Sequence, residues 1–377
     1  MVRPTVARID RAALKSNYSA IAGFLDAEAR REKRNAPGII AVVKANAYGH
    51  GDVEVARALE ASGADLLACA DIEEGARLRG AGVQAEILVF GALSVSDLDG
   101  LFDARLTPTI STPGAARAVQ AAASRYRQRL RYHLKIDTGM NRLGFRFDNL
   151  ARTLPELLAS PNLQLDAVYT HFATADDAGS PLFDSQRKRF EQAVGAIKGL
   201  GGQPRYCHAA NSAALLRDSR VWCDRVRPGS LLYGIVPPPL APTLPLRPVM
   251  SLVSRIVAVK GMRVGESTGY GARFTAERPT TLATVPAGYA DGVDIRLAGR
   301  GAVLVRGRRV PVVGAVSMDM LAADVTGLDV SPGDEVVIIG EQGDDQIDVR
   351  EIAATIGTNP LEVVCRIGTR IERRYDA

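Results

Sequence analysis

Residues 38–70 read GIIAVVKANAYGHGDVEVARALEASGADLLACA, and this stretch decides the fold. It opens with an apolar run at 38–43 and closes with a second one at 65–70, each bounded by turn residues. Residues 52–62, between them, have helical character. A strand, a helix and a second strand in this order predict a βαβ unit with two parallel strands.

The same alternation continues along the first 235 residues. Further apolar runs of strand length fall at 86–90, 106–110, 130–136, 163–170, 204–207 and 225–235, and helical segments fall at 72–79, 113–125 and 181–200. Eight strands that alternate with helices predict a closed (β/α)8 barrel rather than an open sheet. A further helix should precede the first strand, because Asp10 is placed to cap it and Leu14, Tyr18, Ile21 and Leu25 follow at helical spacing.

A proline-rich segment at 236–248, VPPPLAPTLPLRP, ends this pattern. Proline lacks an N–H group, so the segment is neither a helix nor a central strand, and we interpret it as a stiff linker. Strand-like runs follow at 252–259, 281–285, 303–306, 310–316 and 334–339, with one clear helix signal at 348–356. The sequence therefore predicts a barrel domain over residues 11–240 and a smaller, mainly β domain over residues 246–377.

Length and composition agree with this division and exclude other classes. A chain of 377 residues suits a barrel of about 250 residues with a smaller domain. Its 47 Lys and Arg against 42 Asp and Glu are spread along the chain, which does not indicate nucleic acid binding. The N-terminus lacks the apolar core of a signal peptide, and no apolar run is long enough to cross a membrane. The four cysteines show no CxxC spacing, so we expect reduced thiols in a cytoplasm and no metal site.

Reactive residues follow the first predicted strand. Lys44 comes directly after the apolar run, in the segment KANAYGHG at 44–51. In a (β/α)8 barrel, active sites lie where the strands end and the next loops begin. A lysine at a strand end is commonly a solvated residue, but in a dry barrel mouth it loses its proton readily, as Schiff-base formation requires.

The fifth predicted strand carries polar residues on one face. His133, Lys135 and Asp137 share this face, which should point into the barrel. Arg142 follows in a loop framed by Gly139 and Gly144. A guanidinium there is a candidate clamp for a carboxylate or phosphate, although an ordinary surface arginine is the alternative.

The last three strands end in further polar residues. His171 follows the sixth strand, His208 the seventh, and Arg227 lies on the eighth. Asn211 and Ser212 open a helix, and the next loop carries Gly229 and Ser230, at the place where barrels often bind phosphate. A lysine that can form an imine near a phosphate site indicates pyridoxal phosphate.

These residues resemble the motifs of bacterial alanine racemases. The matching segments, in the family's order, are 41–51 (AVVKANAYGHG), 135–145 (KIDTGMNRLGF), 208–212 (HAANS), 227–229 (RPG), 288–292 (GYADG) and 317–320 (SMDM). The first is shared by fold-type III pyridoxal phosphate enzymes, whereas the full set is specific to racemases. The resemblance extends from about residue 4 to the C-terminus.

The resemblance implies roles for these residues in racemising L- and D-alanine, for peptidoglycan supply or alanine breakdown. Lys44 would hold pyridoxal 5′-phosphate and act as the base on one face of Cα, and Tyr270 would be the base on the opposite face. Arg142 and the Met318 backbone amide would bind the substrate carboxylate. Residues implied at the cofactor are Tyr48, His171, His208, Asn211, Ser212, Arg227, Gly229 and Ser230. Lys135 stands where some members carry a carbamylated lysine, and Tyr289 and Asp319 resemble residues of the substrate entryway.

The resemblance also implies an arrangement between chains. In the family the second base comes from the β domain of a partner, so we expect a head-to-tail homodimer. Residues 4–10 would join that β domain as a strand. Two segments depart from the family pattern: residues 370–373 read RIER where many members have Arg-Val-Pro-Arg, with Thr369 near a tyrosine position, and Ser317 replaces a common cysteine.

Three other functions share some of these features. Fold-type III basic amino-acid decarboxylases have the same lysine motif and domain plan, but commonly place a carboxylate where Arg227 stands. A non-catalytic pyridoxal phosphate carrier resembles the barrel alone, and the segment from residue 248 onward with Tyr270 argues against it. A racemase of broader specificity is the third alternative.

Overall fold

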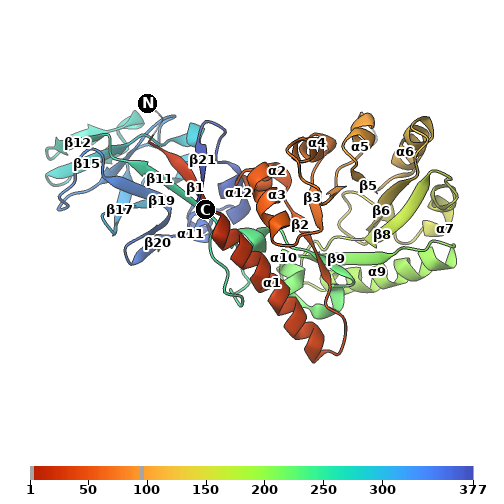
Figure 1. Ribbon diagram of the computed structural model, residues 1–377. Coiled ribbons are helices and arrows are strands. Elements are labelled where there is room, and N and C mark those ends of the chain that lie inside the picture. Colours follow the sequence, from red (N-terminus) through yellow and green to blue (C-terminus); the bar gives the residue numbers. More distant parts are fainter. Residues whose placement is uncertain (1–3, 94–96, 377) are drawn as a thin grey trace.

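The computed structural model describes residues 4–93 and 97–376 and contains two domains that lie side by side (Figure 1). The first is built on eight strands: β2 (Gly38–Val42), β3 (Leu66–Cys69), β4 (Glu86–Val89), β5 (Thr107–Ile110), β6 (Leu130–Asp137), β8 (Leu163–Tyr169), β9 (Tyr206–Asn211) and β10 (Arg225–Arg227). Each strand pairs in parallel with the next, and β10 pairs back to β2. The barrel is therefore closed, and the predicted fold class is confirmed.

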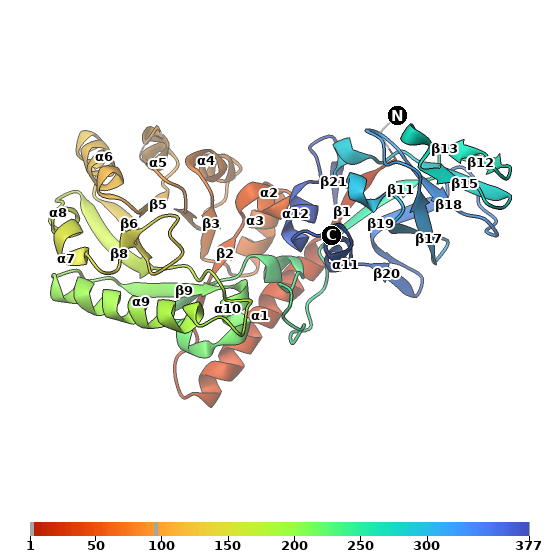
Figure 2. The same ribbon diagram turned by 180° about the vertical axis from the view of Figure 1, so that it is seen from behind.

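Helices surround the outside of this barrel. After α1 (Arg11–Arg31) come α3 (Asp52–Ala61), α4 (Ile72–Gly80), α5 (Asp99–Asp103), α6 (Pro113–Arg125), α7 (Leu150–Thr153), α8 (Pro155–Leu158), α9 (Leu182–Gly199) and α10 (Ser212–Arg217). Figure 2 shows α9 alongside β9, with α4, α5 and α6 on the other side of the barrel. The Asp10 carboxylate accepts the Ala13 N–H at 2.7 Å, so the predicted cap of α1 is confirmed.

The eighth strand is shorter than predicted. The apolar run at 225–235 indicated one long strand, but only Arg225–Arg227 form it. Pro228 has no N–H with which to continue the ladder, and Ser230–Tyr233 form a 3₁₀ turn instead. As a result, residues 228–230 lie at the mouth of the barrel.

The second domain is a mainly antiparallel sheet. Its strands are β1 (Val6–Asp10), β11 (Met250–Arg255), β12 (Ala258–Met262), β15 (Thr280–Val285), β16 (Ala302–Val305), β17 (Arg308–Val313), β18 (Leu321–Asp324), β19 (Glu335–Gln342), β20 (Asp345–Ile347) and β21 (Glu372–Asp376). The strand β1 pairs antiparallel with β11 and parallel with β21. A strand that precedes the barrel in the chain thus belongs to the sheet that follows it (Figure 1).

Two details of this domain differ from the prediction. The run at 252–259 is split, because Ile256 N donates to Asp334 O while Val257 N donates to Thr284 O, so the chain changes partner strands there. Besides the predicted helix, which is α11 (Val349–Ile356), the domain contains α12 (Pro360–Cys365). The sequence did not indicate α12, because this helix has only six residues and follows α11 closely. In the described part of the chain, no helix has the length and apolar character needed to span a membrane.

Candidate active site

The carboxyl ends of the barrel strands surround a cavity of about 450 Å³, a volume typical of sites for small molecules. Ten residues proposed from the sequence line it: Lys44, Tyr48, Lys135, Arg142, His171, Asn211, Ser212, Arg227, Gly229 and Ser230. Ten further residues complete the lining, and those with large or charged side chains that were not predicted as site residues include Phe90, Tyr169, Asp176 and Leu361. Tyr169 could have been found, because it lies two residues before His171 and so shares its face of the strand.

Lys44 and Tyr48 are held at the two ends of a left-handed turn. The segment labelled α2 (Lys44–Tyr48) is not a right-handed helix, because Ala45, Asn46 and Ala47 have φ of 51–55° and ψ of 45–53°. Tyr48 also has a φ of 54°. Each left-handed residue other than glycine costs about 1–2 kcal/mol, so neighbouring contacts must hold this turn in place.

Three side chains supply these contacts. Glu74 Oε1 accepts the Ala45 N–H at 2.7 Å, and Asn46 Oδ1 accepts the Asp52 N–H at 3.0 Å. His50 Nδ1 lies 3.0 Å from Ala47 O and 2.9 Å from Tyr48 O. Because both partners are carbonyl oxygens, His50 Nδ1 carries the proton. The turn is thereby bonded at its start, at its centre and at its end.

Positive charges crowd the cavity beside this turn. Burial lowers the pKa of Lys44, and the Arg142 guanidinium lowers it further. Burial and then Arg142 lower the pKa of Lys135 to about 8. Both amines therefore lose their protons more readily than an exposed lysine, and a bound anion would be stabilised by the positive charge around it.

Arg142 is positioned by a loop that folds back on β6. Asp137 Oδ1 accepts the N–H groups of Gly139 at 2.9 Å and Asn141 at 3.0 Å. Gly144 has a φ of +129°, and a Cβ there would lie 2.6 Å from Asp137 N. The glycine that frames Arg142 is therefore required for the loop to pack against the strand.

Small polar groups at the ends of β9 and β10 form a cradle. Ser212 Oγ accepts the Gly229 N–H at 2.9 Å, which joins the two loops. The Ser230 hydroxyl is buried and has no hydrogen-bond partner among the described residues. A Cβ on Gly229 would lie 2.3 Å from the Tyr48 hydroxyl, so this glycine allows Tyr48 to reach the cradle. Asn211 contributes differently, since its Oδ1 caps α10 by accepting the Ala214 N–H at 2.9 Å.

The base of the cavity is formed by Arg227. Its NH1 lies 2.8 Å from His208 Nδ1, and its NH2 donates to Thr170 O at 2.8 Å and Ala209 O at 2.9 Å. His171 Nδ1 lies 3.3 Å from the same NH2. Burial lowers the pKa of Arg227 to about 10, which leaves it a cation at neutral pH. His208 lies behind Arg227 and does not line the cavity.

Four of the proposed site residues lie on the β domain instead. The exposed fractions of Tyr270, Met318 and Tyr289 are 79%, 52% and 47%, and none of them lines the cavity of its own chain. The backbones of 289–290 and 317–318 are hydrogen-bonded to one another, and Asp319 Oδ1 accepts from Arg370 at 2.6 Å. One chain therefore does not bring Tyr270 together with Lys44.

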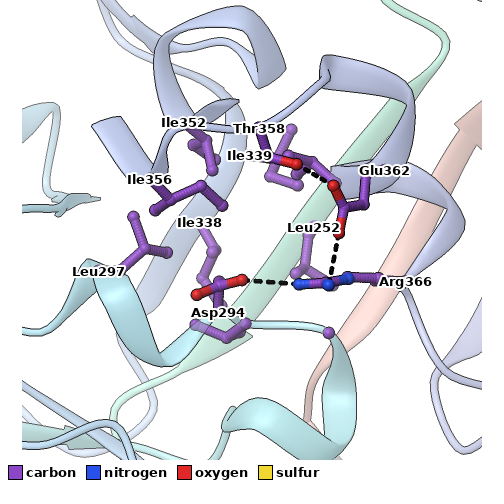
Figure 3. A pocket seen from close by; sticks show the side chains of 13 residues that line it. Leu252, Asp294, Leu297, Ile338, Ile339, Ile352, Ile356, Thr358, Glu362 and Arg366 are labelled. Carbon is purple, nitrogen blue, oxygen red and sulfur yellow. Dashed lines mark hydrogen bonds and ion pairs between the residues drawn. The ribbon is translucent and has the colours of Figure 1, made fainter. Parts of the chain in front are cut away.

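A second, much smaller cavity of about 20 Å³ lies inside the β domain (Figure 3). Its walls are mainly aliphatic, and the figure shows Arg366 between Asp294 and Glu362 at one side. Arg366 NH1 donates to Asp294 Oδ2 at 2.8 Å, and Arg366 also pairs with Glu362. Its volume is that of about one or two water molecules, so it is a packing space and not a substrate site.

The fold and the site together define a class of barrel enzymes. Its members have a reactive lysine after the first strand, an anion cradle after the last two strands, and a second, β domain. Family models match both halves of the chain: "Alanine racemase, N-terminal domain" at residues 9–237 and "Alanine racemase, C-terminal domain" at residues 249–375. The chain belongs to the alanine racemase family.

Individual relatives agree over the full length. The chain is 39% identical to an alanine racemase from Carboxydothermus hydrogenoformans, over 99% of this chain and 100% of that protein. The structure of alanine racemase from Streptomyces lavendulae superposes with a TM-score of 0.94 at 33% identity, covering 100% and 98% of the two chains. That from Bartonella henselae, solved with covalently bound pyridoxal phosphate, gives 0.86 at 27% identity, with 99% of each chain covered.

Proposed function

We propose that this chain interconverts L- and D-alanine with pyridoxal 5′-phosphate as cofactor. The observation that carries the proposal is the cavity, which is lined by Lys44, by the residues of the anion cradle and by Arg227. Membership of the family supports the reaction, and the Bartonella henselae relative, with its covalently bound pyridoxal phosphate, supports the cofactor.

The cradle fits the phosphate of this cofactor. Among the described residues the buried Ser230 hydroxyl has no hydrogen-bond partner, and Gly229 lets the Tyr48 hydroxyl reach the cradle, because a Cβ there would lie 2.3 Å from it. Together with Tyr48, Ser212 and Asn211, these groups would hold the phosphate by hydrogen bonds. The half-buried Lys44 amine, with its lowered pKa, would form the covalent link to the cofactor.

When bound, the cofactor stabilises negative charge on the substrate Cα after proton loss. Lys44 would move the proton on one face of Cα, and Tyr270 would move it on the other face, so that the configuration inverts. Arg142 and the Met318 amide would hold the substrate carboxylate, and Tyr289 with Asp319 would border its entryway. Arg227, a permanent donor, would face the ring nitrogen of the cofactor, with His171 and His208 as its neighbours.

We propose that the active enzyme is a head-to-tail homodimer. Tyr270 and Met318 are exposed on the β domain and do not reach the cavity of their own chain. A second copy would bring these residues to Lys44, and the first copy would do the same in return. Because the four cysteines are free, we place this dimer in a reducing compartment such as the cytoplasm.

Lys135 is proposed to carry a carbamate. Its pKa of about 8 leaves part of the amine neutral and able to attack carbon dioxide, which forms an N–C bond and releases one proton. The product is an anion beside Arg142, where the free amine is a repelling cation. Labelling the native protein with ¹³C-bicarbonate should give one protein-bound carbamate resonance that is missing in Lys135→Ala, and no such resonance would remove this assignment.

One experiment tests the reaction. Purified protein with pyridoxal phosphate and L-alanine in deuterated water should produce D-alanine, with deuterium at Cα of the inverted product. Deuterium exchange without inversion would contradict the assignment of two bases. Release of carbon dioxide would favour a decarboxylase. If neither D-alanine nor carbon dioxide is formed, a non-catalytic pyridoxal phosphate carrier is favoured. Inversion of larger amino acids at comparable rates would indicate a broader racemase.

A further inference from the structure

A series of hydrogen-bonded side chains runs through the barrel behind Arg227. Arg227 NH1 lies 2.8 Å from His208 Nδ1, His208 Nε2 lies 3.0 Å from His133 Nδ1, and His133 Nε2 lies 2.9 Å from the Tyr206 hydroxyl. Arg227, His208 and His133 are at most 4% exposed. We call these four residues the interior series. It begins at the carboxyl end of β10 and ends at the first residue of β9, at the opposite end of the barrel.

All hydrogen bonds in the interior series run in one donor-to-acceptor direction, from Arg227 to Tyr206. A guanidinium only donates hydrogen bonds, so His208 Nδ1 must accept and the proton of His208 must be on Nε2. His208 Nε2 then donates to His133 Nδ1, which places the proton of His133 on its own Nε2. That N–H donates to the Tyr206 oxygen. Each imidazole is therefore neutral and in the same tautomer, and each donor in the series follows from the charge on Arg227.

Burial supports the neutral state of both rings. Desolvation lowers the pKa of His133 to about 3, and it lowers the pKa of His208 well below its ordinary value. A second proton on either ring would have to go to Nδ1, which already faces an N–H donor. That donor is Arg227 NH1, at 2.8 Å, for His208, and His208 Nε2, at 3.0 Å, for His133.

The far end of the series is anchored by charges. Asp166 Oδ2 lies 3.9 Å from His133 Nε2, and Asp166 Oδ1 lies 3.3 Å from Arg205 NH1 and 3.9 Å from Arg131 NH1. The Tyr206 ring lies beneath Arg225, whose Cζ is 5.2 Å from the ring centroid. The contact with Arg225 holds the last acceptor in place, and Asp166 lies next to the His133 nitrogen that donates to it.

We propose that His133 and Tyr206 are positioning residues for Arg227. Acting through His208, they hold the guanidinium in one orientation and keep it a donor toward the cavity. This inference rests on the proposed function, in which Arg227 faces the ring nitrogen of the cofactor. A guanidinium held in this way can only donate, so that nitrogen is kept as an acceptor, without a proton of its own.

The tautomers can be observed directly. The chain has only four histidines, so the holoenzyme labelled with ¹⁵N-histidine gives few signals, which single His→Gln variants assign. We expect protonated Nε2 and unprotonated Nδ1 for both His133 and His208 from pH 6 to 9. Protonation of Nδ1 in either ring would overturn the inference. This readout does not depend on turnover, so it stands apart from failure of the proposed reaction.

Two substitutions of His133 test the effect on Arg227. His133→Asn keeps an acceptor for the His208 N–H, whereas His133→Leu leaves that buried N–H without one. The unsatisfied donor disfavours the wild-type arrangement by a factor of about 10 or more in its equilibrium constant. We expect His133→Leu to lower kcat about 10-fold, with little change in the KM for alanine, and to shift the visible absorbance of the bound cofactor. His133→Asn should restore both toward wild type.

A matched control and a milder variant complete the test. Tyr132→Phe removes a hydroxyl from the neighbouring buried residue of β6, outside the interior series, and should leave kcat and absorbance unchanged. If His133→Leu does not fold, Tyr206→Phe removes only the last acceptor and should shift the absorbance in the same direction. Wild-type kcat and absorbance in both His133 variants, or in Tyr206→Phe, would contradict the inference.

Discussion

The Glu74 carboxylate accepts the backbone N–H of Ala45 at 2.7 Å, directly after the lysine of the candidate site. Its other oxygen accepts the Ala70 N–H at 2.8 Å. One carboxylate at the start of α4 thus joins the loops that follow β2 and β3. Because the turn after Lys44 is left-handed at four non-glycine residues, this contact stabilises a conformation that the local sequence disfavours.

Substitution of Glu74 should therefore weaken cofactor binding without altering any group that touches the cofactor. Glu74→Ala leaves two N–H groups without acceptors, and we expect the cofactor Kd to rise about 10-fold or more. Glu74→Gln keeps one acceptor and should have a smaller effect. Titration of the stripped protein with pyridoxal phosphate, followed by visible absorbance, measures this. The exposed neighbour Glu73 is the control, and an unchanged Kd in Glu74→Ala would show that the turn holds without the contact.

Gly229→Ala should disrupt the anion cradle. The new Cβ would lie 2.3 Å from the Tyr48 hydroxyl, so the tyrosine or the loop must move. We expect a large loss of affinity for pyridoxal phosphate and a much smaller loss for pyridoxal, which has no phosphate to place. Gly195→Ala, in α9 with no atom within 4 Å of the added methyl group, should bind both as wild type does. Equal losses for the two cofactor forms would contradict a phosphate cradle.

Mixing two inactive variants should restore activity if the site is shared between chains. Lys44→Ala and Tyr270→Phe each remove a proposed base from every site of a homodimer. A mixed dimer has one site with both residues intact, so equal amounts after subunit exchange should give about a quarter of the wild-type rate. No recovery, with mixed dimers verified by native mass spectrometry, would place Tyr270 outside the shared site.

Stability should fall steeply in mild acid. Burial lowers the pKa of all four histidines, to about 4 for His50 and about 3 for His133. Below pH 6.5 the unfolded chain binds protons that the folded chain does not, so the free energy of unfolding decreases as pH falls toward these values. With four such groups the slope approaches about 5 kcal/mol per pH unit.

His50→Asn tests this account with one histidine. The variant removes one of the protons taken up on unfolding, so its slope should be smaller by up to about 1.4 kcal/mol per pH unit. Urea unfolding between pH 7.5 and 5, at fixed protein and cofactor concentrations, gives both slopes. Parallel curves for the variant and wild type would mean that His50 is protonated in the folded state.

The sequence was sufficient for the barrel and for most of its mouth. Hydrophobic periodicity identified eight strands, and Lys44, His171 and Arg227 follow from the rule that functional groups lie at strand ends. The left-handed turn was not predictable, because no glycine marks its four residues and the contact that holds it comes from Glu74, 29 positions from Ala45 in the chain. Leu361 reaches the cavity from α12, which has no local signal linking it to the barrel.

Only part of the interior series could be predicted, because its members are distant from one another in the chain. Period-two geometry placed His133 on the inward face of its strand, but not its partner. That partner, His208, lies 75 residues further along the chain and meets it only when the barrel closes. His208 was expected at the cofactor and instead supports Arg227 from behind.

The pairing of β1 with β11 and β21 has a consequence during synthesis. Val6 pairs with Val253, so the ribosome must add more than 240 residues before β1 meets its first neighbour. At the usual elongation rate this takes roughly 10–50 s, during which a nascent barrel can form while β1 stays an open edge. Docking of the last strand, β21, then completes both sides of β1, so the second domain closes around the oldest part of the chain.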